Sequence, residues 1–113
     1  MSSDMILNVF IDGQPLRLTI PDSMLAEARG FFEKMDADMD RGWQMSFTWV
    51  ENPDPVQRCQ IAADKLYGAY EMENQNLMTM MGAYILYKLP GVNEIHVSTN
   101  GNMNETEIVL PVT

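Results

Sequence analysis

Residues 54–90, DPVQRCQIAADKLYGAYEMENQNLMTMMGAYILYKLP, form the stretch that decides the fold. Asp54 can act as an N-cap, Pro55 follows at the first helical position, and Gln57 can complete a capping box, so a helix is predicted to begin here. No equally strong stop signal occurs before Pro90. Two rows of residues at heptad spacing are apolar with a single exception at Glu73. These rows are Val56, Ala63, Tyr70, Leu77 and Tyr84, and Cys59, Leu66, Glu73, Met80 and Tyr87.

An unbroken helix over this stretch is too long for a small domain. It would extend roughly 50 Å, whereas a domain of this size has a radius of gyration of about 13 Å. Either the polar run Glu71 to Asn76 kinks or splits the helix, or the helix projects and a second copy of the chain covers it. The side chains of Met78, Ile85 and Leu86 fall off the main seam and need cover of their own, which favours the second arrangement.

The N-terminal segment, residues 5–20, is predicted to be a β-hairpin. Asp12-Gly13 is a dipeptide that supplies positive φ angles in a two-residue turn. A turn at this point gives one wholly apolar face. The expected pairs on that face are Met5 with Ile20, Leu7 with Leu18 and Val9 with Leu16.

A first helix is expected to follow from about residue 23 to residue 40. Pro21-Asp22-Ser23 provides its start, apolar residues recur at three- and four-residue steps, and Gly42 provides its end. Residues 43–49 alternate between apolar and polar side chains, so an edge strand and an ordered arm both remain open.

A second hairpin is expected at the C-terminus, with strands over residues 94–99 and 104–110 around Asn100-Gly101. The element order is then ββααββ. It predicts a two-layer α+β domain over residues 1–113, in which an antiparallel sheet of two hairpins carries two helices, the second of them long, on one face.

Composition excludes several function classes. The chain has 113 residues and a net charge of −9, and a field of that sign repels nucleic acids and anionic membrane surfaces. The N-terminal residues MSSDMILNVF lack the basic and apolar regions of a signal peptide, which predicts a cytoplasmic location. A single cysteine, Cys59, allows no disulfide within the chain.

No catalytic, cofactor-binding or metal-binding residues are predicted. Cys59 lies on the apolar seam, where a free cysteine is typically a small hydrophobe, and His96 is expected to form an exposed ion pair with Glu105 or Glu107 across the hairpin. Asp36, Asp38 and Asp40 do not match a calcium loop, because the sixth and twelfth positions lack glycine and glutamate, and they are expected to form a solvated acidic helix end. Phosphate, dinucleotide and zinc motifs are absent.

Methionines and aromatic residues suggest binding surfaces. The chain contains 11 methionines, and the cluster Met72, Met78, Met80 and Met81 indicates core filling, an adaptable binding surface, or soft-metal binding of the Cu(I) type. Three large aromatic side chains between residues 43 and 49 are typical either of interface anchors or of a lid over the core.

The leading hypothesis is a non-enzymatic cytoplasmic protein that forms a homodimer through the second helix and binds another protein. One alternative is a small-ligand pocket or active site between sheet and helices, an apolar cavity whose polar groups are the hydroxyls of Tyr67, Tyr70, Tyr84 and Tyr87. Another is soft-metal binding by the methionine cluster. The candidate interface residues are Trp43, Phe47, Trp49, Met78, Met81, Ile85 and Leu86.

Overall fold

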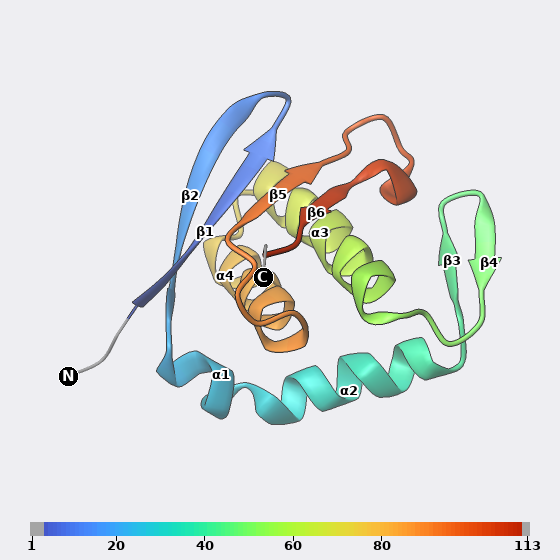
Figure 1. Ribbon diagram of the computed structural model, residues 1–113, viewed down its shortest axis with the longest axis horizontal. Helices are drawn as coiled ribbons and strands as arrows, with labels where there is room; N and C mark the ends of the chain where they lie inside the picture. Colours follow the sequence, from blue (N-terminus) through green and yellow to red (C-terminus); the bar gives the residue numbers. More distant parts are fainter. Residues whose placement is uncertain (1–3, 112–113) are drawn as a thin grey trace.

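The computed structural model describes residues 4–111, and a four-stranded mixed sheet is its central element (Figure 1). The strand order is β2-β1-β5-β6. Neighbours in the pairs β1–β2 and β5–β6 are antiparallel, but β1 and β5, which join the two pairs, are parallel. The strands are β1 Asp4–Ile11, β2 Gln14–Pro21, β5 Glu94–Val97 and β6 Glu107–Val109.

The α+β class is therefore confirmed, whereas the wholly antiparallel sheet and the ββααββ order are wrong. The physical reason is that a strand with alternating apolar residues buries the same face whether its neighbour is parallel or antiparallel. Only the path of the helical connection decides the direction in which β5 enters the sheet, and that path is a tertiary property.

The hairpin β1–β2 has the predicted register. Met5 pairs with Ile20, Leu7 with Leu18, and Val9 with Leu16. Asp12 and Gly13 have φ values of 53° and 76°, as a two-residue turn that matches the strand twist requires. This hairpin contributes Leu7, Val9, Leu18 and Ile20 to the core.

Within residues 4–111, four α-helices replace the two that were expected. The first helix is divided at Ala28 into α1, Ser23–Glu27, and α2, Arg29–Asp40, and both run along one end of the layers (Figure 1). The expected long helix is divided into α3, Pro55–Glu71, and α4, Gln75–Lys88. α4 folds back beside α3, so that the Cys59 thiol lies 3.9 Å from the carbonyl oxygen of Ile85.

The division between α3 and α4 occurs at Glu73, the residue that interrupts the apolar rows. Glu73 has a φ of 56°, its N–H donates to the Tyr70 carbonyl, and the Asn74 N–H donates to the Ala69 carbonyl, which is a Schellman ending. The Asn74 side chain then accepts from the Leu77 N–H at 3.1 Å and begins α4. Of the two arrangements considered from the sequence, the split helix is present and the projecting helix is wrong.

The split removes the need for cover from a second chain. Met78, Met81, Ile85 and Leu86 have exposed fractions of 4%, 1%, 0% and 6%, because the sheet and the other helices of the same chain cover them. They belong to the core.

Capping at the start of α3 is as predicted. The Gln57 N–H donates to Asp54 Oδ1 at 2.7 Å, and the Asp54 N–H donates to Gln57 Oε1 at 2.9 Å. Pro55 occupies the first helical position, where its missing N–H costs nothing.

Two irregular regions complete the fold. Residues 43–50 form a separate hairpin with strands β3 Trp43–Met45 and β4 Thr48–Val50, which resolves the choice between strand and arm. The expected second hairpin has shorter strands than predicted, because the loop before β6 contains the 3₁₀ turn η1, Met103–Glu105. Within the shorter hairpin, Ile95 stands opposite Ile108.

Glycines on the two central helices provide a matched test of packing. A Cβ atom on Gly82 would lie 2.6 Å from Leu18 and 2.9 Å from Ile20, whereas one on Gly68 would meet no atom within 4 Å. Gly68→Ala should raise the free energy of unfolding by about 1 kcal/mol through helix propensity. Gly82→Ala gives the same gain in helix propensity, but the destabilisation from overpacking against two buried side chains is larger. This variant should therefore lower the free energy of unfolding by about 1 kcal/mol. Urea denaturation of both variants measures the difference, and equal stabilisation would contradict the packing of α4 on β2.

Candidate functional site

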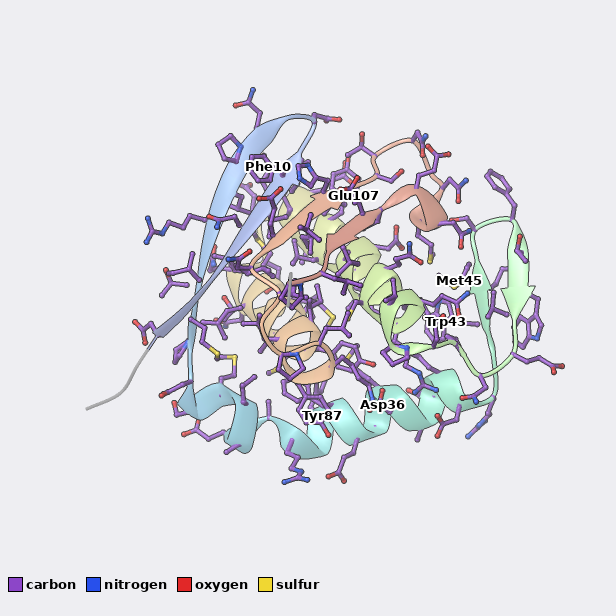
Figure 2. The ribbon with its side chains drawn as sticks, in the orientation of Figure 1. Phe10, Asp36, Trp43, Met45, Tyr87 and Glu107 are labelled. Atoms are coloured by element: carbon purple, nitrogen blue, oxygen red, sulfur yellow. The ribbon has the colours of Figure 1, made fainter. Side chains whose placement is uncertain are left out.

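The hairpin β3–β4, residues 43–50, is named here the aromatic hairpin, and one of its faces is firmly anchored. Met45 is fully buried, and its carbonyl accepts from Asn104 Nδ2 at 2.8 Å. The Ser46 hydroxyl oxygen accepts from the Met103 N–H at 2.9 Å. Trp43 is half-buried against the core, and Figure 2 shows it with Met45 on the side of β3 that faces the helices. The hairpin is therefore held in one position.

The other side of the aromatic hairpin exposes large aromatic side chains. Phe47 is 80% exposed at the turn and Trp49 is 55% exposed on β4. The indole of Trp49 lies against the backbone of Gly42, where a Cβ atom would come within 2.4 Å of the ring. Gly42 has a φ of 110°, so it both ends the first helical region and leaves room for this ring. Neither Phe47 nor Trp49 acts as a lid over the core.

The predicted interface residues fall into two groups. Trp43, Phe47 and Trp49 lie on the aromatic hairpin, Trp43 packed against the core and the other two exposed. The other four lie on α4 inside the core, as described above, so the structure does not place all seven on one surface.

Sequence reasoning missed a polar cluster around Arg58, in the first turn of α3. Arg58 is only 6% exposed, and its Nε donates to the Pro53 carbonyl at 2.8 Å. Its Nη2 donates to Asn52 Oδ1 at 2.9 Å and to Asp40 Oδ1 at 2.8 Å, and its Nη1 donates to Asp36 Oδ1 at 3.1 Å. A buried guanidinium requires such a set of acceptors.

Asp36 is the centre of this cluster and connects three helices (Figure 2). Besides Arg58, its carboxylate accepts from the Lys88 ammonium at 2.8 Å and from the Tyr84 hydroxyl at 2.6 Å. Partial burial raises the pKa of Asp36. The hydrogen bonds from Lys88, Tyr84 and Arg58 together lower the pKa by a larger amount, so it lies below its ordinary value. Burial and the bond to Asp36 raise the pKa of Tyr84. The expectation of a solvated acidic helix end is thus wrong for Asp36, which clamps α2 to α3 and α4.

Only one part of this cluster can be recognised in the sequence, the pair of carboxylates on α2. Asp36 and Asp40 are four residues apart and share a side of α2, and Arg58 and Lys88 are the cations that meet them. The pairing joins residues at least 18 positions apart, so spacing within one helix does not reveal it.

Cys59 and His96, the two side chains considered for catalysis, lie in different environments. Burial raises the pKa of the Cys59 thiol to about 12, which disfavours the nucleophilic thiolate. His96 is exposed and stacks on Phe10 at a centroid distance of 4.7 Å. It pairs with Glu94 at 2.6 Å on its own strand, whereas Glu107 stands opposite in the register. The expected cross-strand ion pair is therefore replaced by a pair along β5.

The residues of the two alternative hypotheses lie in several different environments. No three side chains of His, Cys, Asp or Glu within residues 4–111 are grouped to hold a metal ion. In the methionine cluster, Met72 is 79% exposed whereas Met78 and Met81 are buried. Tyr84 directs its hydroxyl to Asp36, while Tyr67 and Tyr70 stack on each other at the other end of the helix pair.

Comparison with known proteins gives no relative, since no family model, curated protein or solved structure matches the chain. Within the part of the chain that the structure describes, no helix is both long enough and apolar enough to cross a membrane.

The Asp36 cluster predicts an acid-sensitive stability. A carboxylate whose pKa is lowered in the folded state stabilises the protein above the ordinary carboxyl pKa of about 3.9, and this contribution is lost as the pH falls through the folded value. Asp36→Asn should lower the free energy of unfolding at pH 7 by about 2 kcal/mol and flatten its decline below about pH 5. The control Asp38→Asn, on the exposed side of α2, should change it by less than about 0.5 kcal/mol. Denaturation at a series of pH values tests this, and parallel pH profiles for wild type and Asp36→Asn would count against it.

Proposed function

We propose that the protein is a non-enzymatic cytoplasmic module that binds another protein through the aromatic hairpin. The proposal rests on one observation, the 80% exposure of Phe47 and the 55% exposure of Trp49 on a hairpin whose opposite face is anchored. Large aromatic side chains are the most frequent energetic anchors of protein interfaces. Because the hairpin is already ordered, a partner would pay little entropy to fix it.

Anchoring and exposure occur on opposite sides of the same short element. Met45 and Ser46 fix the backbone through Asn104 and Met103. A loop that merely closed the core would direct its aromatic side chains inward, as Trp43 does in part. Phe47 stands at the turn, where it adds nothing to the core, so its exposure is explained best by a partner surface.

A second copy of the chain is the first partner to consider. A chain of this length buries only about 65% of the surface that its unfolded form exposes, so added burial in a homodimer would stabilise it. We propose that such a dimer forms through the aromatic hairpin, since the α4 side chains first assigned to the interface are enclosed within one chain.

Site-specific photo-crosslinking tests the proposal. A benzoylphenylalanine at position 47 should give a discrete crosslinked product in cells, and its mass separates a second copy from a different protein. Trp49→Ala should weaken that complex by roughly 30-fold, as removal of an interface anchor does. The same reagent at Tyr70, which is 42% exposed on α3, is the matched control.

Folding must be unaffected for this result to be informative. Phe47→Ser should change the free energy of unfolding by less than about 0.5 kcal/mol, since the side chain is mostly in water. A lack of product at position 47, or the same product from position 70, would rule out the aromatic hairpin as the binding surface.

A further inference from the structure

A separate cavity of about 510 Å³ lies among α2, α3 and α4, and no residue of the aromatic hairpin lines it. Its size falls in the range of about 300 to 1,000 Å³ that small-molecule sites occupy. The floor is buried and the mouth is open, because Met35, Ala69 and Met81 are at most 8% exposed whereas Phe31 and Met72 are 43% and 79% exposed. The apolar lining consists of Phe31, Met35, Ala69, Met72, Leu77 and Met81.

The sequence of α3 explains why this space exists. Gly68 and Ala69 face the cavity with almost no side chain, and a Cβ atom on Gly68 would meet no atom within 4 Å. Glycine at an ordinary helical φ lowers helix stability by about 1 kcal/mol relative to alanine. The chain therefore keeps a destabilising residue at a position where a larger side chain would fill the cavity.

The charged residues of the lining oppose the charge of the whole protein. Lys34 and Lys65 line the cavity with a single carboxylate, Asp38, whereas the chain has 16 acidic residues and 7 basic ones. Within residues 4–111, neither Lys34 nor Lys65 takes part in an ion pair, while Arg58 and Lys88 are paired with Asp36. Two lysines without an ion pair therefore line an apolar cavity, which matches an anionic head on an apolar body, and the Lys65 ammonium lies 4.9 Å from the centre of the Trp43 ring.

We propose that this cavity binds a small lipophilic carboxylate, of the medium-chain fatty-acid class. Its chain would lie on the three methionines Met35, Met72 and Met81, whose unbranched thioethers adapt to an irregular aliphatic shape. Its carboxylate would lie between the two lysine ammonium groups. A docked helix fits less well, because a helix is about 10 Å wide and only its side chains could enter the cavity.

Dodecanoate is the probe, and dodecyltrimethylammonium, which has the same chain length and the opposite charge, is its matched control. Both are titrated below micelle-forming concentrations into protein labelled with ¹³C at the methionine methyl groups. Dodecanoate should bind one molecule per chain, at least about tenfold more tightly than the cation. The methyl signals of Met35, Met72 and Met81 should shift, whereas that of Met45, on the aromatic hairpin, should not.

Two variants separate the cavity from the head-group contact. Gly68→Leu should keep the protein folded, since the site is open to a side chain, and should abolish dodecanoate binding by filling the cavity. Lys34→Gln should weaken binding of dodecanoate about fivefold and leave the affinity for the cation unchanged or increased.

Three results would overturn the proposal. They are equal affinity for the two head groups, unchanged dodecanoate binding by Gly68→Leu, or uptake of many molecules per chain. Crosslinking from position 47 is independent of these results, so the two proposals can fail separately.

Discussion

The reversal of the chain at Glu73 and Asn74 is the constraint on which the rest of the structure depends. A non-glycine residue in the left-handed region costs roughly 1 kcal/mol, and here it ends one helix while the next residue caps another. Without this reversal α4 would extend past the sheet and leave its apolar side chains in water. With it, α4 covers the sheet beside α3, and Lys88 arrives next to Asp36 and Arg58.

Signals confined to a few neighbouring residues predicted structure well. Asp12-Gly13 determined a turn and its register, and Asp54 with Gln57 determined a helix start, because in each case the interacting atoms belong to adjacent residues. Glu73 was visible as the one break in the apolar rows. Its effect was underestimated because a heptad pattern is compatible with one long helix and with two helices packed on each other. Strand direction in β5 had no local signal at all.

The candidate site was predictable only in part, for the same reason. Composition located the aromatic residues between 43 and 49, but it did not reveal which of them point to the core: Trp43 does in part, whereas Phe47 does not. The pairing of Arg58 with Asp36 and the gathering of Met35, Met72 and Met81 at one cavity depend on how three helices cross. Such crossings follow from the packing of whole helix faces, which no short pattern encodes.

Lys65 connects the two surfaces for which functions are proposed. Its ammonium lies 4.9 Å from the centre of the Trp43 ring, beneath the aromatic hairpin, and the same side chain lines the cavity. A carboxylate that draws this ammonium into the cavity would weaken its attraction to the indole face, which is worth about 0.5 to 1 kcal/mol at exposed sites. Thermodynamic linkage makes such an effect reciprocal. If a ligand in the cavity changes the affinity of the hairpin for its partner by some factor, the partner changes the affinity of the cavity for the ligand by the same factor. The modest size of the contact limits this coupling to about fivefold in either affinity, so each surface would work largely on its own.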